Sequence, residues 1–116
     1  MGAILEIHLV VAFLVVLCAL VFSWNDLGRR VVNAVAALQF VLGLVLAGIM
    51  GANHIAMPRN LWLHIVSALL VLASYGMALR YGKRAGGAQT ALTYSIVGFV
   101  LVFVTFYLGL RMAGKV

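Results

Sequence analysis

The chain has 116 residues, of which 66% are hydrophobic and 9% are charged, and its formal net charge is +6. A soluble domain of this size could not bury so much apolar surface, so the composition predicts an integral membrane protein with the lipid bilayer as its solvent. The single cysteine excludes an intrachain disulfide and a four-cysteine metal site. The basic residues cluster between apolar runs, as membrane-flanking charges do, and therefore predict no nucleic-acid partner.

Four apolar stretches follow one another along the chain, at residues 4–24, 31–50, 61–81 and 93–112. Each has about 20 residues, which as a helix span the hydrocarbon core of about 30 Å. Connections as short as those between them make successive helices antiparallel neighbours. Open sheets are excluded because unpaired backbone groups find no partners in lipid. The sequence therefore predicts an all-α fold in one domain, 1–116, that is an up-down four-helix transmembrane bundle.

The lysines and arginines predict the orientation of this bundle in the membrane. The first and third connections carry Arg29, Arg30, Arg80, Lys83 and Arg84, whereas the other side carries Arg59, Arg111 and Lys115. Cytoplasmic segments carry the excess of Lys and Arg. We therefore expect the first and third connections in the cytoplasm and both termini outside, in the plasma membrane of a bacterium or archaeon.

Two of the three histidines lie inside predicted spans. His8 lies about four residues into the first stretch and His64 about four residues into the third. These two helices run in the same direction, so the imidazoles are expected at matched depth below the outer surface, on diagonal helices whose inner faces meet. His54 lies in the connection on that same side. An ionisable residue inside a membrane span is by default a candidate functional residue.

The inner face of each helix is predicted by counting in steps of three and four residues. From His64 the count gives Ser67, Ala68, Val71, Ser74, Tyr75 and Ala78. The other three faces are Ala12, Val15 and Ala19 beside His8; Ala36, Gln39, Phe40, Gly43 and Ala47; and Ser95, Gly98, Val102, Thr105 and Gly109. Small residues allow helices to pack closely in membranes, and they also leave room for a flat macrocycle. The faces by themselves are compatible with either role.

The paired histidines favour a shared metal. Two facing neutral imidazoles can each give a nitrogen to the iron of one haem. Structural zinc needs four ligands and catalytic zinc three, and the carboxylates and thiols to complete such a set are missing. The sequence therefore predicts haem b with His8 and His64 as iron ligands, and it places Gln39 and Gly43 of the second helix at the cofactor.

The residues expected at the outer rim allow two interpretations of the cofactor site. Arg59 and His54 are placed to meet the haem propionates, because cations and ring N–H groups bind carboxylates. His54 could also join His8 and His64 as a third ligand for copper, and copper is therefore the alternative cofactor.

The segment LQFVLGLVLAG (38–48) followed by LWLHIVSALLVLA (61–73) resembles heme A synthase, in whose four-helix halves a Leu-Gln-x-x-Leu-Gly helix precedes a helix opening with Leu-His. In that family each half presents two histidines on diagonal helices, and these map onto His8 and His64. The resemblance implies a half-size relative within the four-helix membrane proteins of cytochrome b type. The family also uses acidic residues at its outer face, whereas Glu6 lies about 200° around the helix from His8. The haem site is therefore carried over, but the oxygenation of a haem methyl group is not.

The leading hypothesis is a membrane cytochrome b-like protein with one haem near the outer face, transferring single electrons to or from a quinol or a respiratory-complex partner. A homo-oligomer is compatible with this hypothesis. Two alternatives stay open: a half-size heme A synthase-like enzyme that acts as a dimer and requires Glu6, and a copper-handling membrane protein. A small multidrug exporter fits the length but needs a carboxylate deep in the membrane, and Glu6 is close to a helix end.

Overall fold

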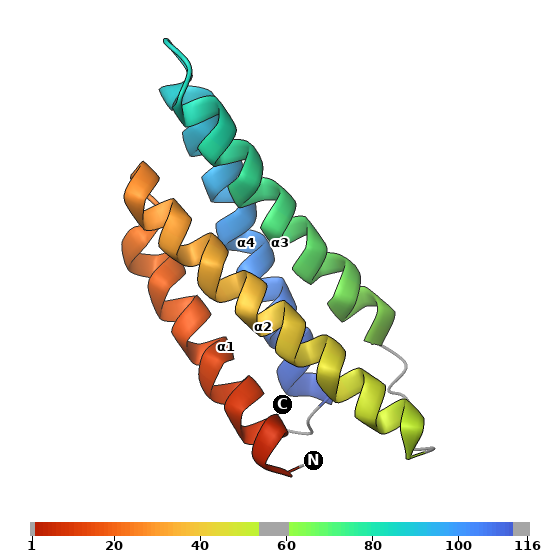
Figure 1. Cartoon of the computed structure of the whole chain (residues 1–116). Coiled ribbons are helices and arrows are strands. Elements are labelled where there is room, and N and C mark those ends of the chain that lie inside the picture. Colours follow the sequence, from red (N-terminus) through yellow and green to blue (C-terminus); the bar gives the residue numbers. More distant parts are fainter. Residues whose placement is uncertain (1, 54–60, 113–116) are drawn as a thin grey trace.

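The computed structural model describes residues 2–53 and 61–112, which form the helices α1 (Gly2–Phe22), α2 (Asp26–Ala52), α3 (Leu61–Gly82) and α4 (Ala88–Met112). Successive helices run in opposite directions, so that α1 begins and α4 ends at the same end of the bundle (Figure 1). α1 packs against α2 and α4, and α3 packs against the same two helices, so α1 and α3 lie on a diagonal. The predicted all-α, up-down four-helix bundle is confirmed.

All four helices are long and apolar enough to cross a membrane. Their outward faces carry large apolar side chains, among them Phe13, which is 54% exposed, and Trp62, which is 76% exposed. Contiguous apolar surface on this scale is unfavourable in water, whereas in a bilayer it meets lipid tails. The chain is therefore an integral membrane bundle.

The helix boundaries differ from the predicted ones most at α2, which begins at Asp26 instead of 31. Asn25 adopts an extended backbone and its side-chain oxygen accepts the N–H of Gly28 at 2.7 Å, which caps the first turn. Asp26 then adds a negative charge where the helix dipole favours one. A polar segment that hydropathy assigns to a connection is thus the first turn of the helix. α1 lies two residues earlier than predicted and α3 is one residue longer.

α4 begins at Ala88 instead of 93, because the connection before it is a compact turn. The N–H of Arg84 donates to the carbonyl of Tyr81 at 3.1 Å, and the N–H of Gly87 donates to the carbonyl of Arg84 at 3.0 Å. Gly86 has φ +75°, a left-handed conformation that glycine adopts without steric cost. The turn is therefore complete within a few residues, and the helix starts before its apolar stretch does.

The inner face predicted for α3 is confirmed. The buried residues of that helix are Ser67, Val71, Ser74, Tyr75 and Ala78. The core of the bundle is a cluster of mostly small and β-branched side chains from all four helices: Val11, Val15, Ala19, Val32, Ala36, Val71, Tyr75 and Val102. Close packing of small residues gives membrane helices the van der Waals contacts that the hydrophobic effect supplies in water.

A buried cluster of hydrogen-bonded polar side chains connects the α1–α2 turn to α3. The Ser23 hydroxyl donates to the carbonyl of Ala19, so the buried Tyr75 hydroxyl must donate to Ser23 Oγ, 2.7 Å away. Arg29 is 6% exposed. Its Nε donates to the Ser23 carbonyl at 3.0 Å, and its Nη1 pairs with the Asp26 carboxylate at 3.1 Å. The hydroxyls of Ser23 and Tyr75 and the guanidinium group of Arg29 therefore each have a hydrogen-bond partner.

The direction of the Ser23–Tyr75 hydrogen bond predicts unequal effects of removing either partner. Tyr75→Phe leaves Ser23 bonded to Ala19 and loses one hydrogen bond between the α1–α2 turn and α3, an expected loss of about 0.6 kcal/mol in the free energy of unfolding. Ser23→Ala leaves the buried Tyr75 hydroxyl without its hydrogen-bond acceptor, and the free energy of unfolding is expected to fall by about 1–3 kcal/mol. Reversible unfolding in mixed detergent measures both values, and a larger loss for Tyr75→Phe would contradict the assigned direction.

Candidate functional site

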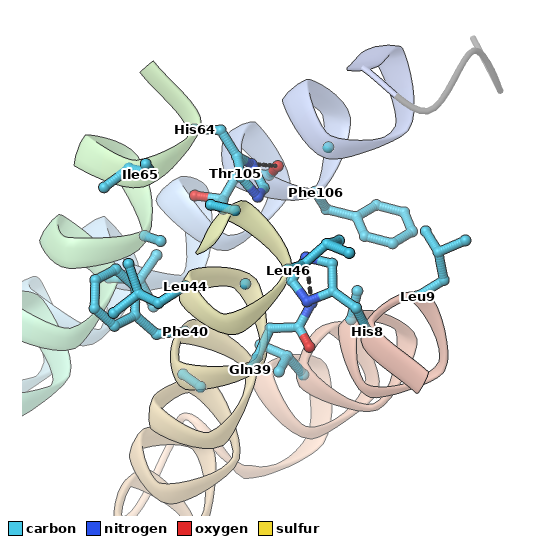
Figure 2. A pocket seen from close by; sticks show the side chains of 18 of the residues that line it. His8, Leu9, Gln39, Phe40, Leu44, Leu46, His64, Ile65, Thr105 and Phe106 are labelled. Carbon is cyan, nitrogen blue, oxygen red and sulfur yellow. Dashed lines mark hydrogen bonds between the residues drawn. The ribbon is translucent and has the colours of Figure 1, made fainter. Parts of the chain in front are cut away.

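His8 of α1 and His64 of α3 lie opposite one another across the bundle. Their ring centroids are 6.4 Å apart and their ring planes are inclined by 82°. Figure 2 shows the two side chains reaching into the same space from different helices. The sequence-based expectation that these two histidines meet at matched depth on diagonal helices is therefore met by the structure.

The histidines line an apolar cavity of about 260 Å³ between the four helices. Every helix contributes to its wall, and the small residues among those that line it are Ala12, Ala36, Gly43, Ala47, Ala68 and Gly109. The polar side chains on the wall are those of His8, Gln39, His64 and Thr105. A mostly apolar pocket with a few convergent polar groups is the usual form of a small-molecule or cofactor site.

His8 packs against α2. A Cβ atom added to Gly43 would lie 3.2 Å from Cε1 of His8, so the glycine makes room for the ring. The Nε2 atom of His8 lies 3.5 Å from the side-chain nitrogen of Gln39, at the outer limit of a hydrogen bond. Within residues 2–53 and 61–112, the buried atoms His8 Nδ1 and Gln39 Oε1 have no hydrogen-bond partner. The His8 side of the cavity therefore holds polar atoms that a bound molecule could satisfy.

His64 packs against α4 in a different way. Its Nδ1 atom lies 3.0 Å from the backbone carbonyl oxygen of Thr105, and a dashed line marks this contact in Figure 2. A Cβ atom added to Gly109, one helical turn further along, would lie 3.1 Å from Cε1 of His64. The imidazole can approach the backbone of α4 because this glycine has no side chain.

The other predicted site residues divide into three groups. Gln39 and Gly43 line the cavity beside His8, and their predicted contact with a cofactor stays a prediction. His54 and Arg59 lie outside the residues that the structure describes. Glu6 is exposed on the outside of α1 and does not line the cavity, in agreement with its predicted position around the helix.

The described part of the chain contains no group of three or more His, Cys, Asp or Glu side chains placed to hold a metal ion. A copper site of three histidines would need His54 as its third member. The His8–His64 pair is thus the candidate ligand set that the described residues provide.

The carbonyl of Thr105 was not anticipated as a partner of His64. The sequence places Thr105 and Gly109 on the inner face of the fourth helix, where close packing is a sufficient reason for both. The only signal for their joint role is the spacing of four residues, which puts the carbonyl of one beside the Cα of the other. That spacing occurs throughout any helix, so it does not identify the contact.

The fold and the site define a class: an integral membrane four-helix bundle that encloses an apolar cavity with a pair of facing histidines on diagonal helices. Comparison of the chain with protein-family models, with curated proteins and with solved structures gives no match. The functional argument therefore depends on the geometry of the cavity and its two imidazoles.

Proposed function

We propose that the chain is a membrane haem protein of cytochrome b type in which His8 and His64 ligate the iron of one haem b. The separation of the two rings is the observation that carries this proposal. With metal–nitrogen bonds of about 2.0 Å and about 1.1 Å from ring centre to nitrogen, two imidazoles that share one metal would have centroids up to about 6.2 Å apart. The observed separation is 6.4 Å.

The walls of the cavity support the same proposal. The alanines and glycines on all four helices leave space beside the imidazoles, and the apolar lining suits a porphyrin ring. The buried polar atoms His8 Nδ1 and Gln39 Oε1, which have no partner in the described part of the chain, also favour a ligand. An unsatisfied buried polar group costs about 1–3 kcal/mol, and a bound ligand can remove that cost.

The bound haem would supply one-electron chemistry, and the chain would supply its surroundings. His8 and His64 would hold the iron, while the apolar wall would exclude water. We further propose that His54 and Arg59 meet the propionates, and that the termini lie outside the plasma membrane of a bacterium or archaeon, as the distribution of Lys and Arg favours. A quinol or a respiratory subunit at that side would be the electron partner.

A visible spectrum of the detergent-purified protein tests the proposal. After expression with sufficient haem, the wild type is expected to contain about one haem per chain, since one pair of imidazoles holds one iron, and to show the sharp reduced bands of bis-histidine ligation after dithionite. The double variant His8→Ala/His64→Ala is expected to lose both. His54→Ala is the control for the ligand assignment and is expected to keep the bands, because in this proposal His54 meets a propionate and not the iron.

Three results of this experiment would contradict the proposal. A wild type without haem would exclude it, and copper in the metal analysis would then favour the copper alternative. Undiminished haem in the double variant would place the cofactor elsewhere. Loss of the bands in His54→Ala would show that His54 is itself a ligand.

A further inference from the structure

The two histidines of the cavity have different hydrogen-bonded surroundings. A carbonyl oxygen only accepts hydrogen bonds, so the 3.0 Å contact with the Thr105 carbonyl requires a proton on Nδ1 of His64. The lone pair of this imidazole is therefore on Nε2. The tautomer and the orientation of His64 are set by the backbone of α4, before any metal binds.

Among the described residues, no backbone carbonyl holds His8 in a comparable way. Among residues 2–53 and 61–112 its Nδ1 has no partner, and the polar atom near its Nε2 is the neutral side-chain amide of Gln39, at 3.5 Å. That amide has an unpartnered oxygen of its own and can rotate. The tautomer and the ring orientation of His64 are set by a hydrogen bond to the backbone. Those of His8 are not set by such a bond to the described part of the backbone.

A hydrogen bond from the outer nitrogen of a ligating histidine to a carbonyl orients the ring and raises its basicity, and losing such a partner typically costs about 10- to 100-fold in metal affinity. We propose that His64 is the anchoring ligand and His8 the replaceable one, so that a small neutral diatomic molecule can take the place of His8. This inference rests on the proposed haem. His64 would hold the haem and His8 would be the weaker donor, and replacing one neutral electron-pair donor by another there would need neither an oxidant nor a proton.

The single variants of His8 and His64 test whether the two ligands hold the haem unequally. Carbon monoxide is the probe, and pyridine haemochrome content is a second readout. His8→Ala is expected to keep at least about half of the wild-type haem and to bind carbon monoxide in the reduced form. His64→Ala is expected to keep less than about a tenth, in line with the loss of the hydrogen-bonded ligand. Equal haem contents, or the reverse order, would overturn the inference. A wild type without haem would instead refute the proposed function.

Two glycine variants form a matched pair in case a histidine variant does not fold. Gly109→Ala places a Cβ 3.1 Å from Cε1 of His64 and 3.7 Å from its Nδ1, and so moves the ring away from the Thr105 carbonyl. Gly43→Ala places a Cβ 3.2 Å from Cε1 of His8, which makes no hydrogen bond to a carbonyl in the part of the chain that the structure describes.

The rate of haem transfer to apomyoglobin is the measurement for this pair. It is expected to rise about tenfold more for Gly109→Ala than for Gly43→Ala, because both variants narrow the cavity and only Gly109→Ala also costs His64 its hydrogen-bonding partner. Equal rates for the two variants, or faster release from Gly43→Ala, would overturn the proposed inequality.

Discussion

Replacing Ala68 with phenylalanine is expected to reduce the haem content of the purified protein about tenfold or more. Ala68 lies one helical turn after His64 and lines the cavity. A phenyl ring there would occupy the space proposed for the macrocycle. Overpacking a filled site costs about 1–3 kcal/mol, and each 1.4 kcal/mol changes an affinity about tenfold. The measurement is haem per chain by pyridine haemochrome after identical expression and purification.

Ala73→Phe is the matched control for this variant, because Ala73 lies on the same helix with its side chain exposed. It introduces the same ring on the lipid-facing surface and is expected to leave the haem content unchanged. Melting curves of both variants separate a blocked cavity from a misfolded bundle. Full haem content in Ala68→Phe would show that the cavity is not the haem site.

Gly98→Leu is expected to lower the free energy of unfolding by about 3 kcal/mol. A Cβ atom at Gly98 would lie 2.8 Å from Cε2 and 3.0 Å from Cδ2 of Tyr75, and 3.2 Å from Cβ of Ser74. The tyrosine ring is completely buried and its hydroxyl is held by Ser23, so it has no space into which to move. The α3–α4 interface would have to separate to admit a larger residue.

Gly76→Leu provides the control for this prediction. Gly76 is also a mid-helix glycine, but within the described ranges no heavy atom beyond its chain neighbours and its own helix backbone lies within 4 Å of the Cβ that a substitution would add. The two variants share the same change in intrinsic helix propensity, so the difference between them isolates the packing contact. Reversible unfolding in mixed detergent gives both values, and equal losses would refute the role assigned to Gly98.

The spans and their inner faces could be predicted from the sequence, because both follow from the regular geometry of a helix. A rise of about 1.5 Å per residue links stretch length to membrane thickness, and a period of about 3.6 residues determines which side chains share a face. Counting from His64 therefore found Ser67, Val71 and Tyr75, all of which are buried. The matched depth of His8 and His64 follows from the same rise along two helices that run in one direction.

The helix starts were predicted less well, because hydropathy records only where lipid begins. Polar residues such as Asp26 and Arg29 are poor candidates for a membrane span, yet the Asn25 cap and the burial of Arg29 make them part of α2. Arg29 is buried because a serine carbonyl and a carboxylate lie within reach of its guanidinium group. Such partners come from the turn geometry and not from composition.

The sequence alone determined that four helices cross the membrane and that two histidines meet within them. Only the tertiary structure decided that His64 is held by the Thr105 carbonyl through the gap at Gly109, while His8 faces the amide of Gln39. The physical reason is that sequence periodicity gives the face of a helix, whereas a contact within about 3 Å also depends on how each helix is rotated and how closely it approaches its neighbour. Those quantities result from the packing of all four helices together.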